Sequence, residues 1–242
     1  MIHDTTIVFS RELRPVLRDP FSVIFTMVQP LFFLVLFSPL LPEETGLQWF
    51  VPGMIVMSCL FGAGSTGGNL LFEMQTGSHE RMLVSPLRRS ALIVGRALKE
   101  IVPTMVHSVL IIAITIPFGF RPHAGAVFGL LLLAIMCVGL GALSYSLALA
   151  SKNKEWIFWA VQQTISFPLL LLAGMLLPIE GGPAWLQFLS KLNPLSYLVN
   201  AERELFNGEV FTANVGLGLL AAVGVAALGL WVGTRQMRHA VA

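Results

Sequence analysis

The sequence predicts an all-α membrane protein with six transmembrane helices, because of its composition and the way its hydrophobic residues are grouped. Of its 242 residues, 55% are hydrophobic and only 12% are charged, against about 25% charged residues in a typical soluble domain. The mean hydropathy is +0.79. The hydrophobic residues form runs of about 20 or more, the length that crosses a bilayer as a helix. The net charge of +2 gives no reason to expect nucleic-acid binding.

Six segments qualify as transmembrane helices. None contains Asp, Glu, Lys or Arg, and one such charge at a helix centre costs about 2.5–3.5 kcal/mol on insertion. Backbone polar groups must pair within each segment in lipid, which favours helices. The first segment begins only at residue 21 and lacks a small-residue cleavage site, so we do not expect a cleaved signal peptide. The segments are residues 21–41, 49–72, 101–120, 124–150, 156–177 and 213–232.

The basic residues predict the orientation of the chain. Twelve Lys and Arg residues fall on the side that carries both termini and the loop at 73–100, and three fall on the other side. Loops rich in Lys and Arg stay in the cytoplasm. We therefore expect a multi-pass protein of the cell (inner) membrane, with both termini cytoplasmic.

Two segments outside the spans have hydrophobic patterns of their own. In residues 2–20, the hydrophobic residues from Phe9 to Leu17 share one helical face. This pattern predicts a helix that lies in the headgroup layer and is bent at Pro15. The alternative is a frayed tail. Residues 178–210, on the outer side, are hydrophobic for a loop, which predicts short re-entrant helices before the last span. The charged face of the N-terminal helix carries Arg11, Glu12, Arg14 and Arg18.

Few titratable side chains lie deep in the predicted spans. Apart from Tyr145 and the two cysteines, there is only His107, and Glu100 on the same face is placed at the membrane edge. Pumps driven by protons or ions carry buried charges along their path, so a self-powered secondary carrier is not expected. Cys59 and Cys137 lack the spacing of a metal site and are interpreted as core residues.

The sequence lacks the common nucleotide-binding and hydrolytic motifs. No Lys directly follows a Gly, which excludes a P-loop, and neither G-x-S-x-G nor H-E-x-x-H occurs. Residues 62–67 match G-x-G-x-x-G but lie inside a charge-free span, so we interpret glycines of this kind as helix-packing positions. We expect no enzyme, no metal site and no cofactor of its own in this chain. Three glycine pairs form small-residue faces: Gly64 and Gly68, Gly125 and Gly129, and Gly229 and Gly233.

The loop at 73–100 is too long for a simple connection and contains the signal of a short helix. Ser78 is suited to cap a helix through residues 80–84, which Pro86 would stop. Met82 and Leu83 on that helix would anchor it in a groove of a soluble partner. The alternative is a charged loop in solvent.

Three stretches together resemble the membrane subunits of type-2 ABC exporters, similar to permeases of the daunorubicin-resistance and nodulation-factor export kind. They are residues 10–13 with 18–20, residues 77–86 followed by Gly95 and Arg96, and the outer residues 177–203 with their Asn-Pro-Leu-Ser-Tyr run at 193–197. The resemblance covers nearly the whole chain. It departs at residues 74–76, Met-Gln-Thr, where the family usually has a basic–acidic pair.

The resemblance implies that residues 1–242 form a single transmembrane domain, which is half a transporter. Two ATP-binding subunits, carrying ATP and Mg, and a second permease copy or paralogue would complete the complex. The N-terminal helix would be the connecting helix, with Arg11, Glu12, Arg14 and Arg18. The loop helix would be the coupling helix that docks on the ATP-binding subunit, through Gly77, Ser78, His79, Glu80, Arg81, Met82, Leu83, Pro86, Arg88 and Arg89.

The resemblance also implies a substrate path lined by the second and fifth spans, whose candidate residues would equally serve ordinary helix packing. Alternating access would move a hydrophobic or amphipathic substrate, a drug or a lipid-like molecule, out of the cell. Export of a lipid-linked glycan or other lipid, and a non-transporting membrane scaffold, are the alternatives. Pro168 leaves the direction of the residues after it open. The path candidates are Phe61, Asn69, Gln162, Gln163, Phe167 and Met175.

Overall fold

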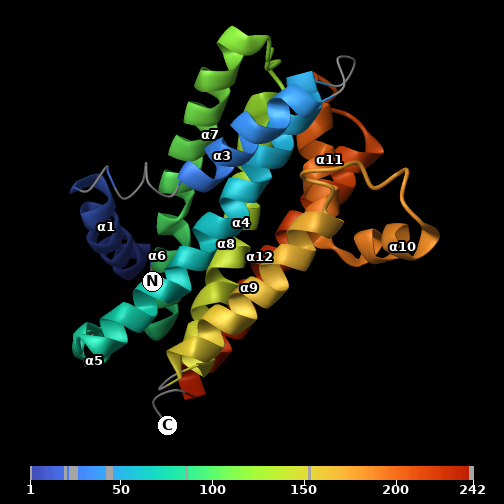
Figure 1. Ribbon diagram of the computed structural model, residues 1–242. Coiled ribbons are helices and arrows are strands. Elements are labelled where there is room, and N and C mark those ends of the chain that lie inside the picture. The colour runs from blue at the N-terminus through green and yellow to red at the C-terminus, as the bar shows by residue number, and fades with distance from the viewer. Residues whose placement is uncertain are drawn as a thin grey trace.

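The structure is a bundle of helices grouped around one central helix, α8 (Ala126–Ala150). This computed structural model describes residues 2–18, 21, 27–41, 46–84, 87–151 and 154–239, and every regular element in that part of the chain is helical. α8 packs along both α4 (Gly46–Gln75) and α12 (Ala213–His239) (Figure 1). The all-helical prediction is confirmed for these residues.

Four helices in the described part of the chain are long and apolar enough to cross a membrane, which confirms a multi-pass membrane protein. Besides α4, α8 and α12, the fourth is the run Arg89–Phe118, which combines α6 (Arg89–Lys99), α7 (Ile101–Thr115) and the 3₁₀ turn η2 (Ile116–Phe118). These four correspond to the second, third, fourth and sixth predicted spans; the third ends two residues earlier than predicted, at Phe118, and the fourth begins two residues later, at Ala126.

The first and fifth predicted spans correspond to shorter helices. The first contains α3 (Val28–Phe37) and the 3₁₀ turn η1 (Ser38–Leu40), and its residues 22–26 lie outside the described chain. The fifth is α9 (Glu155–Leu172), in which two adjacent glutamines, Gln162 and Gln163, interrupt the apolar sequence. The arrangement of six spans therefore stays a prediction.

The end of α9 differs from the predicted end of the fifth span, residue 177. Pro168 has no backbone N–H to donate, and Gly174 adopts a left-handed φ of 68°, so the helix stops at Leu172. Met175 therefore lies beyond the helix, wholly buried in the core. A Cβ added to Gly53 of α4 would lie 2.6 Å from the Met175 carbonyl oxygen, so the two segments touch through their backbones.

The predicted small-residue faces are confirmed as places where helices approach closely. A Cβ at Gly64 of α4 would lie 2.9 Å from the Gln162 side chain of α9, and one at Gly68 would lie 2.9 Å from the Trp159 ring. A Cβ at Gly229 of α12 would clash with the backbone of α8. The glycines at 125 and 129 meet α11 in the same way. The G-x-G-x-x-G match at 62–67 lies inside α4 and serves this packing.

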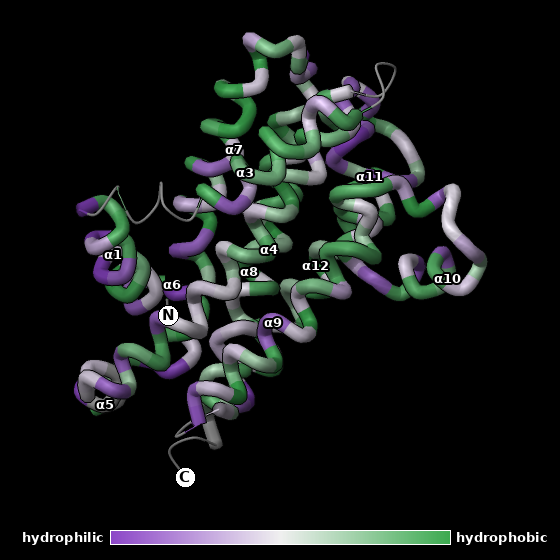
Figure 2. Tube along the Cα trace, viewed as in Figure 1, coloured by the Kyte–Doolittle hydropathy of each residue, from purple (hydrophilic) through white to green (hydrophobic). Residues whose placement is uncertain are grey.

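The N-terminal helix is confirmed as α1 (Ile2–Arg18), which continues through Pro15 and packs on α6. Val8 of α1 and Met237 of α12 belong to one hydrophobic cluster, so both ends of the described chain lie at the same end of the bundle. An even number of crossings produces this arrangement. Figure 2 shows hydrophilic residues on α1 and long hydrophobic stretches in α3 and α7.

The predicted short helices before the last span are confirmed as α10 (Ala184–Leu192) and α11 (Pro194–Phe206). The Asn193 side chain accepts a hydrogen bond from the Leu195 N–H at 3.0 Å and caps α11. α11 is buried against α12, α4 and α8, whereas no residue of α10 is buried. Insertion of these helices into a leaflet stays a prediction.

Candidate functional site

Arg96 of α6, a buried arginine, joins four helices at the end of the bundle where α1 and α5 lie. Its Nε donates to Glu12 Oε1 of α1 at 3.2 Å, and another nitrogen forms an ion pair with Glu73 near the end of α4. Its Nη1 donates to the Tyr145 hydroxyl of α8 at 3.2 Å. Only 3% of Arg96 is exposed. Buried charges are retained when they are paired and hydrogen-bonded, and this guanidinium is.

The short helix predicted in the 73–100 loop is present as α5 (Ser78–Leu83), directly after Gly77 in a left-handed conformation with a φ of 67°. The predicted cap by Ser78 is wrong, because Gly77 occupies the cap position and Ser78 begins the helix. The Ser78 hydroxyl instead accepts a hydrogen bond from Arg11 of α1 at 3.3 Å. Arg11 also donates to the Met82 sulfur, and Met82 is buried.

The other predicted docking residues surround this contact or lie outside the description. Arg81, Arg88 and Arg89 are exposed, as are Arg14 and Arg18 of α1. The side chains of His79, Glu80 and Leu83 and the whole of Pro86 lie outside the described residues. α5 lies at the extremity of the bundle, where α4 ends (Figure 1). The described part of the predicted docking segment is thus an exposed basic surface held to α1 by Met82 and Ser78.

The predicted path residues do not gather in one place. The rings of Phe61 and Phe167 meet edge-to-face with centroids 6.3 Å apart, between α4 and α9. Gln163 is exposed. Asn69 lies nearer the C-terminal end of α4, at a water-sized cavity of about 10 Å³ that Arg96 also lines. Met175, as described above, is in the core. Of these candidates, Gln162 alone lines the cavity between α4, α8 and α9.

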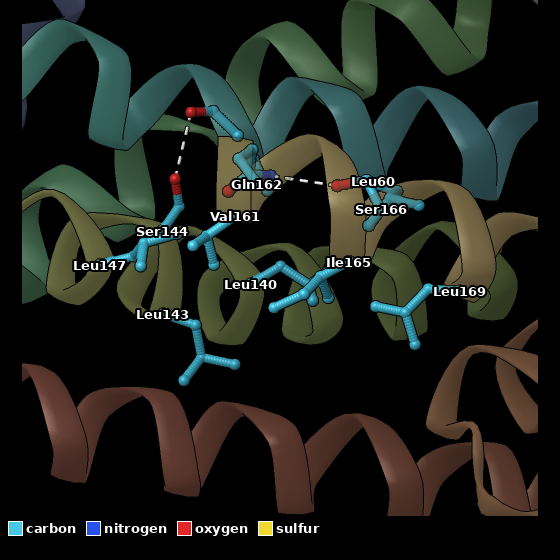
Figure 3. Close-up of a pocket in the computed structure, with 12 residues that line it drawn as sticks. Leu60, Leu140, Leu143, Ser144, Leu147, Val161, Gln162, Ile165, Ser166 and Leu169 are labelled. Atoms are coloured by element: carbon cyan, nitrogen blue, oxygen red, sulfur yellow. Dashed lines mark hydrogen bonds between the residues drawn. The ribbon is translucent and has the colours of Figure 1, made fainter. Parts of the chain in front are cut away.

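That cavity has a volume of about 270 Å³ and lies between α4, α8 and α9 (Figure 3). Gln162 donates to the Ser166 hydroxyl at 3.3 Å, one turn further along α9. Ser144 of α8 donates to the Gly64 carbonyl oxygen of α4 at 3.1 Å. The other lining residues are aliphatic or glycine.

Sequence reasoning missed several buried charges. Lys99 and Glu100 are 5% and 1% exposed and form an ion pair at 2.6 Å. The position of Glu100 at the membrane edge stays a prediction. Glu100 is buried because it is the single residue between α6 and α7, and its side chain faces α4. Its Oε2 is 3.5 Å from the Ser65 hydroxyl. His107, which the sequence places deep in the third predicted span, is buried as well.

The most unusual buried charges are two neighbours in α11. Glu202 is wholly buried, and neither of its carboxylate oxygens has a hydrogen-bond partner among the described residues. Burial raises the pKa of Glu202 to about 8. Its Oε2 packs against Gly129 of α8. The sequence places Glu202 in an outer loop, so its burial becomes evident only from the packing of α11.

Arg203 points to a different part of the bundle. One of its nitrogens donates to the Gly174 carbonyl oxygen at 2.6 Å, and its Nε donates to that of Trp49 at 3.1 Å. Its guanidinium stacks over the Trp49 ring at 3.7 Å from the centroid. Burial lowers the pKa of Arg203 to about 10. Arg203 therefore fastens the turn after α9 to the start of α4.

The described residues contain no group of three or more His, Cys, Asp or Glu side chains that could hold a metal ion. Cys59 and Cys137 are both buried and free, as expected for core residues. In the described part of the chain, the features with functional chemistry are thus a short helix in a basic segment, held to a buried ion-pair cluster, and an uncharged cavity between α4, α8 and α9.

Comparison with known proteins shows the family. The model of the ABC-2 type transporter family matches residues 3–207, which is most of the chain. The chain belongs to the ABC-2 type transporter family. It is therefore a membrane permease subunit of an ABC transporter, a class that works with a separate ATP-binding subunit and carries no ATPase site of its own.

Individual relatives are similar over most of this ABC-2 chain. It is 27% identical to a protein named as a transport permease, ycf38, in Cyanophora paradoxa, over 85% of this chain and 79% of the relative. It is 25% identical to the daunorubicin resistance ABC transporter permease protein DrrB1 of Streptomyces coeruleorubidus, over 86% of this chain and 77% of the relative. It is 27% identical to a protein named as a multidrug ABC transporter permease, YbhR, in Escherichia coli K12, over 66% of this chain and 44% of the relative.

Proposed function

We propose that this chain is the permease subunit of an ATP-driven exporter that moves a hydrophobic or amphipathic substrate out of the cell by alternating access. Two ATP-binding subunits dock on two permeases, each through its α5, and both chain termini and α5 lie in the cytoplasm. The drug-resistance and multidrug names of two relatives support a drug-like or lipid-like amphiphile as the substrate class.

The observation that carries this proposal is the mechanical connection of α5. Only two residues separate α5 from α4, which is one continuous helix from Gly46 to Gln75. Arg11 holds α5 to α1, and Arg96 holds α1 to the end of α4. A displacement of α5 therefore moves α1 and α4 together. Since α4 runs the length of the bundle, the displacement reaches its opposite end.

The rigidity of this end of the bundle supports the lever. Two carboxylates, Glu12 and Glu73, converge on the one Arg96 guanidinium, and the pairs are largely buried. Breaking a buried pair leaves an uncompensated charge, which costs about 3–5 kcal/mol. The cluster resists separation of α1 from α4, so motion imposed at α5 is transmitted and not absorbed locally.

The test is to reverse the charge of Arg81, which is exposed on α5, in the complete transporter. The Arg81→Glu variant should insert normally. Export of a fluorescent single-chain amphiphile from vesicles should fall far below wild type, while ATP hydrolysis continues uncoupled or the ATP-binding subunit no longer co-purifies. Arg121→Glu, an exposed arginine outside α5, is the matched control and should export normally. Full export by a well-expressed Arg81→Glu protein would contradict docking through α5.

A further inference from the structure

The cavity between α4, α8 and α9 lies beside the middle of α4 and of α9 and beside residues 140–147 of α8. It opens to the outside of the subunit beside Ile165, which is 52% exposed. In a membrane this opening faces acyl chains or a neighbouring subunit and not water. The lining residues are Leu60, Ala63, Gly64, Leu140, Leu143, Ser144, Leu147, Val161, Gln162, Ile165, Ser166 and Leu169.

The lining is unsuited to charged or flat aromatic ligands. It contains no Asp, Glu, Lys, Arg or His, and no aromatic ring. The nearby aromatic pair, Phe61 and Phe167, does not line it. Nine of the twelve lining residues are aliphatic or glycine, so the surface offers dispersion contacts to methylene groups and no platform for ring stacking.

The three polar residues of the lining provide one free neutral hydrogen-bonding group. Ser144 donates to the Gly64 carbonyl oxygen at 3.1 Å and accepts from the Gly67 N–H at 3.2 Å, so it serves the contact between α4 and α8. Ser166 accepts from Gln162 at 3.3 Å. The primary amide of Gln162 has two N–H donors and a carbonyl acceptor, and this bond uses one donor. The rest of the amide is available to a ligand.

Glycine at position 64 makes room for this amide. A Cβ there would lie 2.9 Å from Gln162 Nε2, closer than side-chain atoms approach. Apolar cavities stay dry, and a void in a packed bundle forfeits dispersion contacts. A hydrocarbon chain restores those contacts, and Gln162 then recognises an uncharged polar group on it.

We propose that this cavity binds one aliphatic chain of a neutral single-chain amphiphile, and that such amphiphiles are the substrate class of the transporter. This assignment rests on the proposed export function. Ala63, Leu140 and Ile165 contact the chain, and the Gln162 amide hydrogen-bonds a hydroxyl or ester oxygen near it. Bulk phospholipid is the competing occupant.

The experiment uses the permease with its ATP-binding subunit in phosphatidylcholine nanodiscs and a monoacylglycerol that carries a photoreactive diazirine midway along its chain. After irradiation, mass spectrometry should find the label on residues 60–64, 140–147 or 161–169. Excess unlabelled monoacylglycerol should displace it, and monoacylglycerol should stimulate ATP hydrolysis. A phosphatidylcholine carrying the same diazirine should label these residues weakly.

Two variants and one control sharpen the result. Ala63→Phe fills the cavity and should abolish both the labelling and the stimulation. Gln162→Leu keeps the volume and removes the amide, so about two- to tenfold more monoacylglycerol should be needed for half-maximal displacement. Leu131→Phe adds a ring at an exposed site of α8 and should change neither readout.

Equal labelling by phosphatidylcholine, or no labelling of these residues, would overturn the proposal, and so would Gln162→Leu behaving as wild type. The export function is judged separately. If the ATP-binding subunit does not co-purify but the permease alone is labelled specifically, the proposed function fails and the binding site stands.

Discussion

Replacing Glu202 with Gln should make the protein more stable than wild type at alkaline pH and leave it nearly unchanged at acidic pH. Glu202 is wholly buried in α11, and its carboxylate oxygens have no hydrogen-bond partner among the described residues. A buried, unpaired carboxylate is stable only when protonated. Glutamine has almost the same shape and stays neutral at every pH, so it copies the protonated form.

The size of the effect follows from the pKa of Glu202, which burial raises from 4.5 to about 8. Between these pH values the folded protein holds a proton that the unfolded chain has released, so the free energy of unfolding falls as the pH rises through this window and levels off above it. At 1.36 kcal/mol for each pKa unit, the whole fall is about 5 kcal/mol, about half of it between pH 6 and pH 8.

The assay is thermal unfolding of the purified protein in detergent across pH 5 to 9. For a chain of this length, about 1 kcal/mol shifts the Tm by about 2–4 °C, so the wild-type Tm should drop by about 5–10 °C between pH 6 and pH 8 relative to that of Glu202→Gln. Glu209→Gln, at an exposed site just after α11, is the control and should keep the wild-type pH dependence. Parallel Tm profiles for wild type and Glu202→Gln would refute the reasoning, because they would show that Glu202 does not titrate on unfolding.

Three further substitutions test the packing described above. Arg96→Ala leaves two largely buried carboxylates without their cation. It should lower the free energy of unfolding, measured in denaturant, by about 3–5 kcal/mol. Arg89→Ala, at an exposed site, should change this free energy by less than about 0.5 kcal/mol. Gly229→Leu forces α12 away from the α8 backbone at Gly139 and should lower the free energy of unfolding by about 1–3 kcal/mol or more. The measurement is the folded yield in size-exclusion chromatography, which should be lower than that of wild type. A wild-type yield would show that the helices can separate without cost. Arg203→Lys keeps the charge but loses the forked contact with two carbonyl groups and the stacking on Trp49. The Tm should therefore fall, and the tryptophan fluorescence should change. An unchanged Tm and spectrum would show that Arg203 does not fasten these segments.

Much of the fold was predictable because a bilayer imposes simple rules on a sequence. Charge-free runs of sufficient length became α4, α7, α8 and α12, and the amphipathic N-terminus became α1. Glycines spaced four apart marked close helix contacts, which the backbone of α8 against Gly229 illustrates. These features depend on composition and on the period of a helix, which are local properties of the chain.

The candidate site was predictable only in part. A short helix was recognised in this segment, but its cap was misplaced. Gly77, in a left-handed conformation, takes the cap position, and the Ser78 hydroxyl instead accepts a hydrogen bond from Arg11, 67 residues away in sequence. The path candidates were chosen as polar or bulky residues along two spans. Only Gln162 reaches the cavity, since the rotation of α9 about its axis is set by its packing on α4.

By itself, the sequence determined that the chain is a helical membrane protein, where its longest helices lie, and that a short helix in a basic loop follows the second of its predicted spans. Only the tertiary structure decided which charged residues are buried, because burial depends on partners that are distant in sequence. Arg96 is inside the protein because α1, α4 and α8 meet around it, and Glu202 is inside because α11 packs against α8 and not against solvent. The free energy of a buried charge depends on these neighbours, and no local pattern in the chain encodes them.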